Sequence, residues 1–176
     1  MELLPVLQTG RLIVLCAPHA ARDESARLAA ELALRGAVTM LDGGNRFLPY
    51  RVVHLLRRKT VNVAAASNRL FVRRAFTCYE MNSLLADTPA LHQPCLIFDL
   101  LNTFFDDHVP IHETDRLLKS CLGQIHRLRL SAPVVVTIAP PLVEERAFLI
   151  EQVCASADHL LHLAPPISPI CQPPLF

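Results

Sequence analysis

The sequence predicts an α/β fold of three layers, with helices packed on both sides of a mainly parallel sheet. Short apolar runs alternate along the chain with longer helical patterns, as they do when strands are joined by crossover helices. The apolar runs are almost continuous in Val, Ile and Leu, which is typical of strands covered on both faces. With 176 residues, 52% of them hydrophobic and 19% charged, the chain has the composition of one well-packed domain. We expect that domain to span residues 1–164, followed by a proline-rich tail over residues 165–176.

The expected elements begin and end at residues that favour those boundaries. The first strand, Leu12–Cys16, precedes a helix over residues 22–34, and Gly36 follows that helix as a natural C-cap. Pro49 suits the first turn of the next helix. Residues 60–66 are compatible with a short strand or with a connection. The other expected strands cover residues 37–41, 69–73, 95–99, 133–138 and 159–163, and the other helices cover residues 49–58, 78–86, 113–130 and 142–155.

The charge of the chain is unevenly distributed, although its net value is only +1. No acidic residue lies between Asp42 and Glu80, and we call residues 43–79 the basic segment. Such a segment can bind phosphates or an acidic partner, or it can be a solvated helix face. Its cations are Arg46, Arg51, Arg57, Arg58, Lys59, Arg69, Arg73 and Arg74.

Composition also predicts the compartment. The six cysteines form no Cys-x-x-Cys pair and several lie in apolar runs, which suits a reducing cytoplasm better than a disulfide framework. The chain lacks an apolar run of about 18 residues and the pattern of a signal peptide, so we expect neither a membrane span nor secretion. His108 and His112 have the spacing of helical zinc ligands, but Pro110 between them favours a polar loop, and no metal site is expected.

The loop after the first strand is unusual for a nucleotide-binding domain. Residues 17–25 contain neither glycine nor lysine, whereas a phosphate-binding loop needs glycines for close backbone approach and a lysine for charge. Asp23 and Glu24 should interact favourably with the helix dipole there and accept hydrogen bonds from the free N–H groups of the first turn. Asp42 and Asp99 each end an apolar run. The carboxyl ends of parallel strands form the ligand crevice, so these aspartates should share one edge with the loop.

The order and spacing of these motifs resemble the ATPase core of RecA/Rad51-type recombinases, a family of P-loop NTPases. The resemblance covers residues 10–164. It rests on Val38-Thr-Met-Leu-Asp42-Gly-Gly-Asn-Arg-Phe47, on Leu70-Phe-Val-Arg73-Arg74-Ala-Phe-Thr77, on the strand ending at Asp99, and on Ala157-Asp-His-Leu-Leu-His-Leu163. It implies a RecA-like fold, with the phosphate loop at residues 17–25 and the magnesium-orienting acid at Asp99. The catalytic glutamate of the family falls on Gly44.

The missing lysine, glycines and glutamate predict a non-catalytic or atypical relative, a pseudo-ATPase without a required cofactor. We expect it to act in DNA repair or recombination and to bind DNA or a recombinase subunit, in a homo- or hetero-oligomer. The residues expected to bind are Arg46, Arg51, Arg57, Arg58, Lys59, Arg73 and Arg74. In a first alternative, Arg22, Ser25, Asp42 and Asp99 form an unconventional site for ATP and magnesium. In a second, the chain is a protein-interaction scaffold that uses a sheet edge or the proline-rich tail.

Overall fold

A computed structural model describes residues 4–140 and 144–163; the predicted tail over residues 165–176 lies outside the described residues. Six parallel strands form one sheet in the order β3-β2-β4-β5-β1-β6. The first strand of the chain therefore lies between the last two, and β5 separates it from β4. The strands are β1 (Leu12–Cys16), β2 (Val38–Asp42), β3 (Leu70–Arg74), β4 (Cys95–Phe98), β5 (Val134–Ile138) and β6 (His159–His162).

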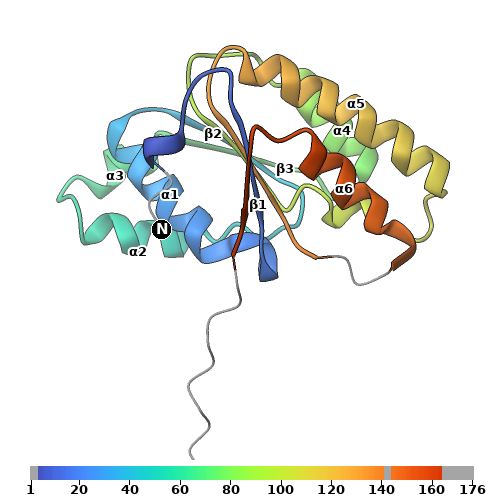
Figure 1. Ribbon diagram of the computed structural model, residues 1–176. Helices are drawn as coiled ribbons and strands as arrows, with labels where there is room; N and C mark the ends of the chain where they lie inside the picture. The colour runs from blue at the N-terminus through green and yellow to red at the C-terminus, as the bar shows by residue number, and fades with distance from the viewer. Residues whose placement is uncertain (1–3, 141–143, 164–176) are drawn as a thin grey trace, which may run out of the picture.

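Helices cover the two faces of this sheet in two separate layers (Figure 1). Side chains alternate along the strands, so Leu12 and Val14 of β1 pack on one side while Ile13 and Leu15 pack on the other. One layer contains α1 (Arg22–Arg35), α2 (Pro49–Arg57) and α3 (Val63–Ser67), and the other contains α4 (Cys78–Asp87), α5 (Ile111–Arg129) and α6 (Ala147–Ala155). The predicted three-layer α/β/α fold with a parallel sheet is confirmed.

The sequence led us to expect strands that are covered on both faces, and this expectation is wrong for two of the six strands. β1, β2, β4 and β5 are buried, but β3 and β6 are largely exposed because they lie at the two ends of the sheet. Phe71 of β3 is 55% exposed. An apolar run indicates a strand, but it does not reveal whether the strand has one neighbour or two.

Three boundaries also differ from those expected. The ambiguous residues 60–66 contribute to α3, which the Asn62 side chain caps by accepting the N–H of Ala65. α5 begins at Ile111, directly after Pro110 at its N-cap. α6 begins at Ala147, after a short 3-10 turn (Glu144–Arg146). No helix in the described part of the chain is long and apolar enough to cross a membrane.

Candidate functional site

Asp42 and Asp99 lie together at the carboxyl edge of the sheet, as the sequence predicts. Asp42 is the last residue of β2, and its register partner on the neighbouring β4 is Phe98, the residue before Asp99. Both aspartates are buried, with 0% and 1% of their surface exposed. Buried carboxylates need hydrogen bonds or opposite charges to offset lost hydration.

Asp42 holds the loop that follows its own strand. Its carboxylate accepts the N–H groups of Arg46 and Phe47, each at 3.0 Å. The Nε of Arg74, at the end of β3, lies 3.3 Å from Asp42 Oδ2, and Arg74 also donates to the carbonyl of Phe47. Through these contacts, Asp42 connects β2, β3 and the loop that follows β2.

Asp99 is less well satisfied. Its backbone adopts a left-handed φ of 47°, and its N–H donates to Thr137 Oγ1 at 2.9 Å. Arg46 Nε lies 3.3 Å from Asp99 Oδ2, but neither carboxylate oxygen has a well-aligned hydrogen-bond partner among the described residues. Burial raises the pKa of Asp99, whereas the Arg46 charge and the Ala139 N–H oppose that shift. A strained, buried acid at a strand end is typical of functional sites.

The glycine pair after β2 closes directly over Asp99. A Cβ on Gly44 would lie 2.5 Å from Asp99 Oδ2 and 2.6 Å from its Cβ, closer than real Cβ atoms approach. A Cβ on Gly43 would lie 3.1 Å from the Asp99 carbonyl oxygen. In the resemblance to RecA-like ATPases, a catalytic glutamate falls on Gly44. This packing excludes any side chain at that position unless Asp99 moves.

The loop that enters α1 turns in the left-handed sense. His19, Ala20 and Ala21 have φ values of 53°, 52° and 51°, a conformation that costs L-residues roughly 1–2 kcal/mol each. No side chain caps α1, so the expectation that the acids of its first turn satisfy free N–H groups is wrong. Asp23 instead binds Arg51 of α2. This ion pair links the first turn of α1 to α2.

A small void lies between this loop and the loop that follows β2. The void bounded by Ala20, Arg22, Arg46 and Phe47 measures about 10 Å³, enough for about one water molecule. Ser25 is 2% exposed and lines a small void together with Phe98 and Thr137, and its hydroxyl has no hydrogen-bond partner among the described residues. Of the four residues proposed for an unconventional nucleotide site, the structure places Arg22, Asp42 and Asp99 at the carboxyl edge and buries Ser25 in the first turn of α1.

Most cations of the basic segment already have partners within the chain. Arg46 and Arg74 bind the two buried aspartates, and Lys59 of the α2–α3 loop binds Glu31 of α1. Arg51 binds Asp23, and Arg69 donates to two backbone carbonyls at the end of α1. In the part of the chain that the structure describes, the cations without an ion pair or hydrogen bond are Arg27, Arg57, Arg58 and Arg73.

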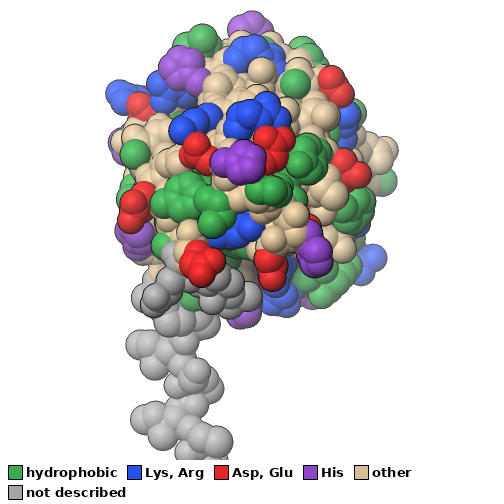
Figure 2. Space-filling model, turned by 90° about the vertical axis from the view of Figure 1, so that its right-hand side faces the viewer, with side chains coloured by type: hydrophobic (Ala, Val, Ile, Leu, Met, Phe, Trp, Pro, Cys, Tyr) green, Lys and Arg blue, Asp and Glu red, His purple; other side chains and the backbone are tan. Residues whose placement is uncertain are grey.

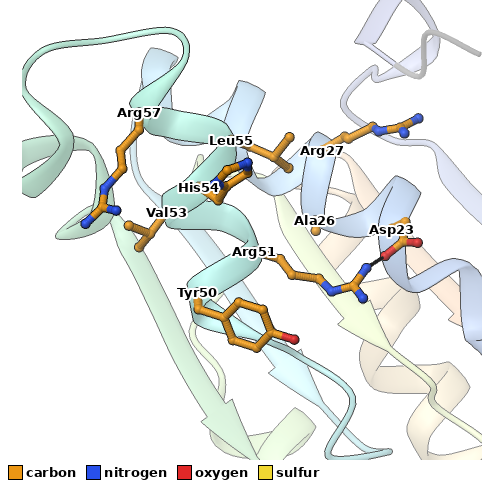
Figure 3. Close-up of a pocket in the computed structure, with 9 residues that line it drawn as sticks. All are labelled: Asp23, Ala26, Arg27, Tyr50, Arg51, Val53, His54, Leu55 and Arg57. Atoms are coloured by element: carbon orange, nitrogen blue, oxygen red, sulfur yellow. Dashed lines mark hydrogen bonds and ion pairs between the residues drawn. The ribbon is translucent and has the colours of Figure 1, made fainter.

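Three of these four arginines lie on the layer formed by α1 and α2, beside a shallow groove of about 850 Å³ (Figure 3). Sequence reasoning named Arg51 and Arg57 of this groove but missed Arg27, Tyr50 and His54. Tyr50, His54 and Arg57 recur at the helical spacing i, i+4 and i+7, so the pattern of α2 could have revealed them as one stripe. The approach of Arg27 from α1 depends on tertiary packing.

The opposite layer presents no comparable group of unpaired cations. On the face drawn in Figure 2, positive and negative side chains are interspersed. Arg116 pairs with Glu113, and Lys119 pairs with Asp115, both along α5. His108 pairs with Asp106, and the described residues include no group of three or more His, Cys, Asp or Glu that could hold a metal ion. The five cysteines that are described are free thiols.

Comparison with known proteins yields no relative from which a function can be transferred. No protein-family model matches the chain, and no curated protein matches it significantly. The function must therefore be inferred from the geometry above.

Proposed function

We propose that this chain is a non-catalytic RecA-like domain that binds DNA as an accessory protein or subunit in repair or recombination. The order of motifs supports the RecA-like frame. β5 alone separates β1 from β4, so the loop after β1 and Asp99 after β4 face one crevice. Nucleoside triphosphatases need such an arrangement, because their phosphate loop and magnesium-orienting acid act on one nucleotide.

The observation that carries the non-catalytic part is the filling of this crevice by the chain's own side chains. Arg46 and Arg74 occupy the surroundings of Asp99 and Asp42, and the void beside them accommodates about one water molecule. A triphosphate would have to displace these ion pairs, and the left-handed loop offers it no lysine. The crevice is therefore better suited to holding the fold together than to hydrolysis.

The DNA-binding part rests on the unpaired arginines. A guanidinium without an internal partner can neutralise a backbone phosphate and release a condensed counterion, which favours binding at low salt. Contacts of this kind position nucleic acid without reading its sequence. Arg57 and Arg58 on the α2 side and Arg73 on β3 supply them within the basic segment.

The test combines DNA binding with nucleotide binding on the same purified protein. Fluorescence anisotropy at low salt should detect binding to labelled single- or double-stranded DNA, and the affinity should fall steeply as salt is raised. Thermal melting with millimolar ATP and Mg²⁺ should show no stabilisation, because a ligand that binds the native state raises the melting temperature. Absence of DNA binding at low salt would overturn the DNA part, and a clear shift with ATP would overturn the non-catalytic part.

One observation favours a second candidate, a protein-interaction scaffold. β3 has an unpaired edge, and the side chains of Phe71, Phe76 and Tyr79 around it are 55%, 67% and 48% exposed. Open strand edges with exposed aromatic residues bind other chains readily. If this edge associates, sedimentation at rising concentration should show self-association that Phe71→Asp removes. A monomer at all concentrations would leave the edge without a role in self-assembly.

A further inference from the structure

The groove between α1 and α2 combines free positive charge with apolar surface. Its volume of about 850 Å³ is that of a pocket that can enclose much of a small ligand, although it is open along one side. α2 buries Val52 and Leu56 in the core and packs along α1, whereas Tyr50, His54 and Arg57 on its outer side are exposed. Figure 3 shows Tyr50 at the start of this outer face and Arg57 near its end. The groove is thus built from the unpartnered face of an amphipathic helix.

The charge of the groove is positive, and one ion pair fixes its shape. The charged residues that line the groove are Arg27, Arg51, Arg57 and one acid, Asp23, so three positive charges less one negative charge leave two in excess. Arg51 spans from α2 to Asp23 on α1 and holds the two helices together (Figure 3). Arg27 and Arg57, on either side of that pair, have no partner among the described residues. An occupant of this groove should therefore carry at least two negative charges.

The aromatic residue of the groove narrows the chemistry of that occupant. Tyr50 is 64% exposed, and Arg27 and Arg57 are exposed as well, so the ring and both guanidinium groups are accessible to a ligand. An exposed aromatic ring beside unpaired arginines suits single-stranded nucleic acid, whose backbone follows the cations while an unpaired base stacks on the ring. A duplex offers the same phosphates, but its bases are stacked inside and cannot lie flat on Tyr50.

We infer that the groove between α1 and α2 binds a single-stranded stretch of nucleic acid. Arg27 and Arg57 contact backbone phosphates, and Tyr50 stacks on a base between them. This inference rests on the proposed DNA-binding function and assigns a site to it. Of the three residues named, only Arg57 is among the binding residues predicted from the sequence. Arg57 makes no ion pair with another described residue.

The experiment measures binding of a fluorescent oligo-dT by anisotropy over a series of salt concentrations. Arg27→Gln and Arg57→Gln should each weaken binding several-fold and reduce the salt slope by about 0.7, the value for one phosphate contact on a single strand. Tyr50→Ala should weaken binding about tenfold, whereas Tyr50→Phe keeps the ring and should bind like the wild type. Arg116→Gln, which removes an exposed arginine on α5 of the opposite layer, is the control and should have little effect, and Arg73→Gln tests the unpaired arginine on β3. Thermal melting of each variant checks that it is folded.

Each other outcome overturns a defined part. If Arg73→Gln weakens binding and the groove variants do not, the protein binds DNA elsewhere, so the proposed function stands and this site is wrong. If the wild type binds neither oligo-dT nor duplex DNA at low salt, the proposed function fails and takes this inference with it. Equal effects of Tyr50→Ala and Tyr50→Phe would overturn the stacking. Displacement of the oligonucleotide by polyglutamate at equal charge would instead make the groove a site for an acidic protein.

Discussion

The two helical layers bury the sheet equally well but treat their charges differently. Along α5, Arg116 and Lys119 each have an acid one turn away, which forms local pairs and neutralises that surface. α2 contains no acid, so its arginines depend on residues of α1 for partners. Arg57 finds none among the described residues. Local pairing neutralises these charges on α5, and its absence leaves unpaired arginines on α2.

The largest expected effect is a difference in stability between variants at two glycines, Gly44 beside Asp99 and Gly123 on α5. Gly44→Ala should destabilise the fold by about 1–3 kcal/mol, because its Cβ would overlap the buried Asp99 side chain. Gly123→Ala in α5 meets nothing within 4 Å, and it should stabilise the fold by about 0.5–1 kcal/mol through helix propensity. Urea unfolding of both variants measures the contrast. Equal stability of Gly44→Ala and the wild type would show that Asp99 does not fix this loop.

The next prediction gives α2 the acid that α5 already has. His54→Glu places a carboxylate three residues before Arg57 and four before Arg58, as Glu113 stands three before Arg116. It should weaken oligo-dT binding about tenfold while helix stability changes by only a few tenths of a kcal/mol. His126→Glu, the same change on exposed α5, is the control. If both variants bind equally well, local pairing on α2 does not govern binding.

A smaller effect separates two aspartates by the sign of their pH dependence. Burial holds the pKa of Asp99 above its unfolded value of about 4, so its contribution to stability is present in acid and lost as pH rises through the folded pKa. Asp99→Asn should therefore be neutral or stabilising at pH 7. The Leu12 N–H and then Arg129 and Arg11 hold the pKa of Asp158 below its usual value, so its stabilisation is lost as pH falls.

Asp158→Asn should accordingly destabilise the fold at pH 7, by about 1 kcal/mol after solvent screening. Melting temperatures of both variants between pH 4 and 8 test the two signs together. A loss of stability in Asp99→Asn at pH 7 as large as that in Asp158→Asn would show that the Arg46 pair outweighs the burial of Asp99.

The smallest effect concerns how the helices of the two layers begin. Thr77 caps α4 by accepting the Glu80 N–H, and the Glu80 carboxylate accepts the Phe76 N–H, whereas α1 follows an uncapped left-handed turn. His19 is exposed, so His19→Gly should relieve strain at no cost in burial and stabilise by a few tenths of a kcal/mol. Thermal melting measures it. A lower melting temperature would mean that His19 stabilises the loop through its side chain.

The sequence predicts the fold and one edge of the candidate site because both follow from local patterns. Alternating apolar runs define the layers. Parallel pairing of β2 with β4 then brings Asp42 and Asp99, which end these runs, to the same edge of the sheet. The ion pairing of the basic segment does not follow from local sequence patterns. Its cations are neutralised by Asp23, Glu31 and Asp99, which lie in other elements, so only the tertiary fold separates bound arginines from free ones.

The exposed side of α2 shows the same limit. The spacing of Tyr50, His54 and Arg57 is visible in the sequence, but their groove exists only because α1 lies alongside and contributes Arg27. The left-handed turn is also hidden, since neither alanine nor proline favours positive φ. Two backbone hydrogen bonds hold the turn: the Ala17 N–H donates to the Ile138 carbonyl, and the Ala20 N–H donates to the Ala17 carbonyl.

The position of β1 in the sheet has a consequence for the order of folding. Among the described strands, β1 pairs with β5 and β6, so it cannot enter the sheet until these later strands have been synthesised. Until Val134–Ile138 has emerged, the apolar residues Leu12–Cys16 remain without a strand partner and depend on chaperones or on α1 for cover. Such distant pairing slows folding. The open edges of β1 are therefore exposed during the interval between the synthesis of β1 and that of β5.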